Sequence, residues 1–120
     1  MAAPNIVNVA TITGKTAGLA VTTSATAIVM NPASSGKVFK INSLIISNID
    51  GTTAADITAD VYKNQTTAFR IAFTIAVPAD ATLVIISKDT SIYLEENDSI
   101  RLTASANSDL EAVCSYEEIS

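Results

Sequence analysis

Large apolar residues occupy every second position between residues 68 and 77, and this alternation constrains the fold more than any other feature. Phe69, Ile71, Phe73, Ile75 and Val77 alternate with Arg70, Ala72, Thr74 and Ala76. A period of two belongs to a β-strand, whose successive side chains point to opposite faces. The pattern predicts a strand that buries the five larger side chains. If the Phe73 ring is buried, Phe73→Ala lowers the free energy of unfolding by about 3–5 kcal/mol.

The same alternation recurs over residues 56–63, 100–104 and 110–117, and turn-forming residues separate these runs. Ile, Val and Thr supply 39 of the 120 residues, and β-branched side chains favour the half-buried surface of a sheet. No stretch of a dozen residues shows the spacing of an amphipathic helix. The expected fold class is therefore all-β: a single antiparallel β-sandwich, jelly-roll or Ig-like, with about eight strands.

The N-terminal part of the chain differs from the remainder, and we expect two regions. Residues 1–18 form an N-terminal strand or arm, and residues 19–120 form the β-sandwich domain. An extended arm would pair with a neighbouring subunit by adding a strand to its sheet. The apolar residues that such an arm would present are Ile6, Val7, Val9 and Ile12.

Composition excludes most catalytic chemistry. The chain has no His and no Trp, and Cys114 is its single cysteine. An intramolecular disulfide and a zinc site are both ruled out, and Cys114, within an alternating apolar run, is predicted to be a buried, inert thiol. The acidic turn over residues 95–98 lacks the spacing of a calcium loop and is predicted to be a solvated turn. We expect no enzymatic activity, no cofactor and no metal.

Charge and hydropathy limit the partners. The net charge of −5 argues against binding to nucleic acid, and no apolar stretch reaches the roughly 20 residues of a membrane-spanning helix. Charged residues make up only 16% of the chain, so the surface is rich in small, weakly polar residues that are easily desolvated against protein. We expect a homo-oligomer or a subunit of a larger assembly.

Four residues on the predicted outer strand faces are further candidates for a partner interface. They are Arg70, Ala72, Thr74 and Arg101. The two arginines either face solvent or form ion pairs with acidic residues of a neighbouring subunit.

Four segments resemble, in the same order, a family of small virion structural proteins of tailed bacteriophages. They are residues 37–48 (KVFKINSLIISN), 77–83 (VPADATL), 93–106 (YLEENDSIRLTASA) and 110–116 (LEAVCSY). The likeness covers roughly residues 36–120. Asn97 stands where the family usually has Gly, and because Asn tolerates left-handed backbone geometry the turn is expected to survive.

The resemblance implies a small β-sandwich protein of a phage particle, made in the host cytoplasm and located in the virion. The expected role is a capsid decoration (cement) protein that binds the major capsid protein or other virion subunits. A tail, neck or fibre subunit is the first alternative. A carbohydrate-binding adhesion module is the second, and the absence of Trp disfavours it.

Overall fold

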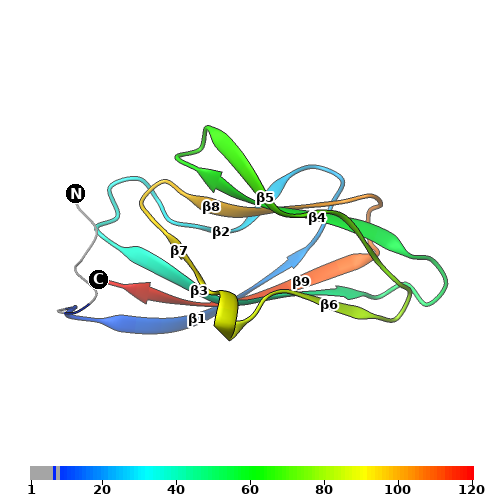
Figure 1. The fold of residues 1–120 in the computed structure, drawn as a ribbon, viewed down its shortest axis with the longest axis horizontal. Coiled ribbons are helices and arrows are strands. Elements are labelled where there is room, and N and C mark those ends of the chain that lie inside the picture. Colours follow the sequence, from blue (N-terminus) through cyan, green and yellow to red (C-terminus); the bar gives the residue numbers. More distant parts are fainter. Residues whose placement is uncertain (1–6, 8) are drawn as a thin grey trace.

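The computed structural model describes Val7 and residues 9–120, and in this part of the chain nine strands form two facing layers (Figure 1). The strands are β1 (Ile12–Ala20), β2 (Thr26–Met30), β3 (Val38–Asn48), β4 (Ala55–Lys63), β5 (Thr67–Val77), β6 (Thr82–Ile86), β7 (Ile92–Leu94), β8 (Ser99–Ala104) and β9 (Leu110–Ile119). A 3-10 turn, η1 (Lys88–Thr90), precedes β7.

All strand pairs are antiparallel, so the predicted all-β antiparallel sandwich is confirmed. One sheet has the order β1-β9-β3-β6, with β7 also pairing with β3, and the other has the order β2-β8-β4-β5. The edge strands β1 and β2 lie on one side of the sandwich, and β5 and β6 lie on the other.

The core lies between the sheets and is built from the alternating residues. Ile57 and Ala59 of β4 and Ile100 and Leu102 of β8 are fully buried, as their alternation predicts. Leu110, Ala112 and Cys114 of β9 and Ile41, Leu44 and Ile46 of β3 face them in the same cluster. Branched side chains that interdigitate between two sheets exclude water and hold the layers together.

The prediction for β5 is wrong. Phe69, Ile71, Phe73 and Ile75 are exposed, and of the five alternating residues only Val77 is buried. The register between β4 and β5 shifts twice, so that Ile57 pairs with Ile75, Ala59 with Ala72 and Asp60 with Arg70. Each shift places one extra residue in β5, which changes the face that the following side chains occupy.

The predicted boundary between residues 18 and 19 falls inside β1. This strand pairs with β9 along its length, from Ile12 opposite Ile119 to Ala20 opposite Glu111. The backbone N–H groups of Ala10 and Thr11 both donate to the carbonyl oxygen of Ser120, at 2.9 and 3.0 Å. Residues 12–20 therefore belong to the sheet, and Ala10 and Thr11 are hydrogen-bonded to Ser120 just beyond β9, so any arm begins before Ala10.

The acidic turn over residues 95–98 is more than a solvated loop. The Asp98 side chain is buried, and its carboxylate accepts hydrogen bonds from the backbone N–H groups of Asn64 (2.8 Å) and Glu95 (3.1 Å). The Lys63 ammonium forms an ion pair with the same carboxylate at 2.6 Å. Asp98 thus ties the β4–β5 hairpin to the turn before β8. Asn97 has a positive φ of 71°, which confirms the predicted left-handed geometry.

Candidate interaction surface

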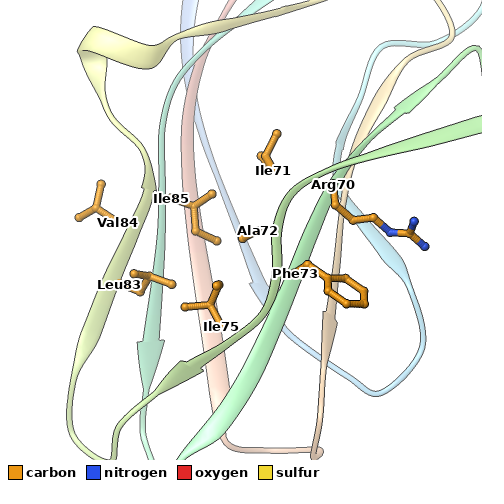
Figure 2. Close-up of a pocket in the computed structure, with 8 residues that line it drawn as sticks. All are labelled: Arg70, Ile71, Ala72, Phe73, Ile75, Leu83, Val84 and Ile85. Atoms are coloured by element: carbon orange, nitrogen blue, oxygen red, sulfur yellow. The ribbon is translucent and has the colours of Figure 1, made fainter.

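A groove runs along the open side of the sandwich, between the edge strands β5 and β6 (Figure 2). We call it the β5–β6 groove. It encloses about 500 Å³ and is lined by Arg70, Ile71, Ala72, Phe73, Ile75, Leu83, Val84 and Ile85. Figure 2 shows Ile71, Ile75 and Ile85 in the space between the two strands, whereas the Phe73 ring and the Arg70 guanidinium extend from β5 on the side away from β6.

Exposed apolar side chains gather at this groove. Of the eleven large apolar residues that are exposed in the described part of the chain, five lie on β5 or β6. Their exposed fractions are 59% for Phe69, 38% for Ile71, 62% for Phe73, 42% for Ile75 and 56% for Val84. Four of the five, all except Phe69, line the groove. Single exposed apolar residues are normal, whereas a group of them is typical of a surface that binds another molecule.

Edge position and irregular strand pairing together bring these side chains to the surface. Ile75 and Phe69 pair with Ile57 and Val61, whose side chains face the core, and are exposed because β5 is an edge strand. The two register shifts lie between these pairs and re-aim Ile71 and Phe73.

Besides the two shifts in β5, the register of β3 and β6 shifts between Leu44 and Ile45, which leaves Ile85 as an extra residue in β6. Thr74 of β5 has a positive φ of 47°. Bulges bend an edge strand, interrupt its hydrogen-bonding ladder and re-aim its side chains. The groove therefore offers apolar side chains rather than a regular edge for strand addition.

The chemistry of the groove suits an apolar partner. Arg70 carries the only polar side chain in its lining, and its guanidinium lies over the Phe73 ring, 5.6 Å from the centroid. Such a cation–π contact stabilises the guanidinium charge beside an aromatic ring. The lining has no carboxylate, hydroxyl, thiol or imidazole, and so no general acid, nucleophile or metal ligand. No cluster of metal-ligating side chains is found among the residues that the structure describes.

The structure places the predicted interface residues at separate sites. Arg70 and Ala72 line the groove, and Thr74 is exposed on the same strand. Arg101 lies elsewhere, paired with buried Asp60 through Nε–Oδ1 and Nη2–Oδ2 contacts of 3.0 and 3.1 Å. Its guanidinium also stacks 3.7 Å from the centroid of the Tyr62 ring. Arg101 therefore already has an ion-pair partner and an aromatic partner within its own chain. Ion pairs of Arg70 or Arg101 with a neighbouring subunit stay a prediction.

The N-terminal candidates lie on the opposite side of the sandwich. Ile12 opens β1 and is 56% exposed, Val7 is 90% exposed, and Val9 is half-buried. Ile6 lies outside the described residues. Ile12, on the edge strand β1, is therefore separated from the groove by the width of the five-stranded sheet.

Sequence reasoning missed most of the groove. It assigned Phe69, Ile71, Phe73 and Ile75 to the core and did not consider β6. One feature of the sequence did mark the β6 side: residues 83–86 read Leu-Val-Ile-Ile, a run without alternation in an otherwise alternating protein. A strand that breaks the period of two cannot divide its apolar side chains between a buried face and a polar face.

Cys114 and Glu118, both outside the groove, are among the groups whose pKa values are shifted. Burial raises the pKa of the Cys114 thiol to about 12, which agrees with the predicted inert thiol. Burial alone would also raise the pKa of Glu118, but hydrogen bonds from Lys15 and Lys37 outweigh it and hold that pKa below its ordinary value. The two ammonium groups lie 3.0 and 3.1 Å from the Glu118 carboxylate.

Comparison with known proteins gives a likeness of fold. No family model matches the chain, and no curated protein matches its sequence. A solved structure of a Bacillus endospore appendage, from "a novel family of disulfide-linked pili", is similar over 92% of this chain and 88% of its own, with a TM-score of 0.54 and 16% identity. At that identity the likeness concerns the fold alone. The described residues include no helix long and apolar enough to cross a membrane.

Proposed function

We propose that this protein is a non-enzymatic structural subunit of a multi-copy assembly. The observation that carries the proposal is the set of exposed apolar side chains along the β5–β6 groove. Covering apolar surface releases about 25 cal/mol for each Å² removed from water, and a groove without catalytic groups has no evident use besides binding. Repetition over many copies turns a modest contact into a stable particle.

The assembly that we propose is the particle of a tailed bacteriophage, with the protein as a capsid decoration protein. The resemblance of residues 36–120 to small virion proteins supports this role, as does the low fraction of charged residues. The protein would be made in the host cytoplasm and located in the virion. Its partners would be the major capsid protein, other virion subunits and further copies of itself.

The similarity to a pilus protein supports an assembly role for this fold, but not a covalent one for this chain. A continuous series of disulfide links needs at least two cysteines in each subunit, and this chain has one. That cysteine, Cys114, is fully buried in the core. The contacts between subunits are therefore proposed to be non-covalent.

A carbohydrate-binding module is the second candidate, because Phe69 and Phe73 expose aromatic rings on one strand. A sugar also needs hydrogen-bond partners for its hydroxyl groups, and Arg70 is the only polar side chain in the groove. Binding of the isolated protein to a glycan array would favour this candidate, and we expect none.

Purified phage particles test the proposed function. Quantitative mass spectrometry should find the protein in many copies per virion, and a reconstruction of the particle should place it on the shell. A few copies on the tail axis would instead identify a tail, neck or fibre subunit. Absence of the protein from mature particles would overturn the virion role altogether.

A further inference from the structure

We propose that the β5–β6 groove binds the N-terminal segment, residues 1–9, of a second copy of this chain. The inference rests on the proposed structural function and names the partner of the same groove. Each copy would carry one segment and one groove, so the contact would join unlike surfaces of neighbouring copies.

The N-terminal segment has the chemistry that the groove requires. Residues 1–11 contain no charged side chain, and Ile6, Val7 and Val9 supply branched apolar groups. Val7 is 90% exposed, and Ile12, where β1 begins, is 56% exposed. The branched apolar side chains of this segment gain from leaving water for the apolar groove, and no charged side chain has to be desolvated.

The apolar residues of the segment, Ile6, Val7 and Val9, cannot reach the groove of their own copy. The backbone hydrogen bonds of Ala10 and Thr11 to Ser120 anchor it beside β1, and β1 and β6 lie at opposite edges of the sheet order β1-β9-β3-β6. Ile6 lies four residues before Ala10, a reach of at most about 14 Å. Three strand spacings amount to about 14 Å across the sheet. Ile12 and Val38 both lie opposite Ile119, whereas β6 pairs with β3 only from Leu44 onward, six residues or about 20 Å further along the strands. The two displacements together exceed the reach of Ile6, so these apolar residues can fill the groove only of another copy.

The charge in the groove favours a segment over the groove of a second copy. The Arg70 guanidinium and the Phe73 ring point away from β6, at the outer rim of the groove (Figure 2), so two copies docked groove to groove would bring two guanidinium groups to the rim of one contact. Like charges at the rim of a contact repel one another. A segment without charged side chains meets no such repulsion.

A contact between unlike surfaces has a structural consequence. It joins copies head to tail, and such an arrangement closes into a ring or continues as a filament according to the rotation between copies. A contact between identical surfaces would stop at a dimer.

Two variants and their mixture test the proposal. One variant lacks residues 2–9 and keeps the groove. The other carries Ile71→Asp and keeps the segment, with Phe73→Asp as a second groove variant should Ile71→Asp fail to fold. We expect the intact protein to form oligomers in sedimentation velocity and each variant alone to be monomeric. Their mixture should form a one-to-one heterodimer, because it contains one usable segment and one usable groove.

Val113→Asp is the matched control, since Val113 is 48% exposed on β9 and does not line the groove. This variant should associate like the intact protein, and circular dichroism should show a β-sheet spectrum for all variants. Oligomers of unchanged size without residues 2–9 would overturn the inference. So would a mixture that stays monomeric when both components are folded.

Binding of the N-terminal segment to the groove can be measured directly with a synthetic peptide of residues 1–12. It should bind the variant lacking residues 2–9, whereas Ile71→Asp or Phe73→Asp in that variant, or Asp at positions 6, 7 and 9 of the peptide, should abolish binding. No binding at about 1 mM peptide would overturn the inference. The virion role would be judged separately, by the copy number in particles.

Discussion

Ile57 and Phe73 carry side chains of comparable hydrophobicity on neighbouring strands, and their surroundings give them opposite roles. Ile57 is fully buried between the sheets, whereas Phe73 is 62% exposed beside the groove. A buried side chain holds the two layers together, and its loss leaves a cavity. An exposed one contributes little to folding and remains available for a partner.

We therefore predict that Ile57→Ala lowers the free energy of unfolding by about 2–5 kcal/mol, and that Phe73→Ala changes it by no more than about 0.5 kcal/mol. Urea denaturation of the variant lacking residues 2–9 measures both effects without a contribution from association. A loss of several kcal/mol in Phe73→Ala would mean that the ring is buried after all.

Glu118 gives a prediction for the pH dependence of stability. Its pKa is lower in the folded protein than its ordinary value of 4.5, because Lys15 and Lys37 stabilise the charged form. The stabilisation is therefore present above pH 4.5 and is lost as the pH falls through the folded pKa. Glu118→Gln should flatten this part of the profile of unfolding free energy against pH. If the free energy of unfolding below pH 4.5 has the same pH dependence in Glu118→Gln, Glu118 does not contribute to the loss of stability in acid.

The β4–β5 hairpin shows, at the level of elements, how one buried side chain positions the candidate surface. Its turn places Asn64 and Gln65 at positive φ values of 52° and 54°, as a tight hairpin turn requires. Asp98, from the turn before β8, accepts the Asn64 N–H and pairs with Lys63 at the hairpin base. The hairpin that carries the apolar side chains of β5 is thereby fixed to the sandwich.

We predict that Asp98→Ala destabilises the fold by about 1–3 kcal/mol for each backbone N–H left without an acceptor. Amide hydrogen exchange should rise at Asn64 and Glu95. Glu95→Ala is the control. The Glu95 side chain is 72% exposed and also pairs with Lys63, so its removal should lower the free energy of unfolding by less than about 1 kcal/mol. Equal effects of the two substitutions would contradict the structural role of Asp98.

For the whole molecule, the protein has a net charge of −5 and a groove that is almost without charge. Long-range repulsion between copies is weak and screened by salt, whereas burial of apolar side chains does not depend on ionic strength in this way. We therefore expect the association between copies to depend little on ionic strength, as it does when apolar burial drives a contact.

Raising the ionic strength about tenfold should change the association constant of the intact protein by less than about threefold, with any change toward tighter binding as repulsion is screened. Calorimetry should show a negative heat-capacity change on association. Association that weakens steeply with salt would indicate an interface of ion pairs instead.

Part of this structure could be predicted from local pattern. The faces of residues 100–104 and 110–114, the buried thiol of Cys114 and the left-handed Asn97 all follow from alternation or residue type. Of the candidate site, Arg70 and Ala72 were placed at a partner surface from the same pattern, and both line the groove. The apolar residues beside them were assigned to the core, because their alternation is that of a buried strand.

The sequence by itself determined that the chain forms a β-sandwich, because the period of two and the β-branched composition are properties of neighbouring positions. Only the tertiary structure decided that β5 and β6 are edge strands, that bulges turn their side chains toward solvent, and that Arg101 pairs with Asp60. These features depend on which strands lie beside one another and in what register. Strand pairing joins residues that lie far apart in the chain. The alternation of apolar and polar residues within one strand does not indicate which strand lies beside it or in what register.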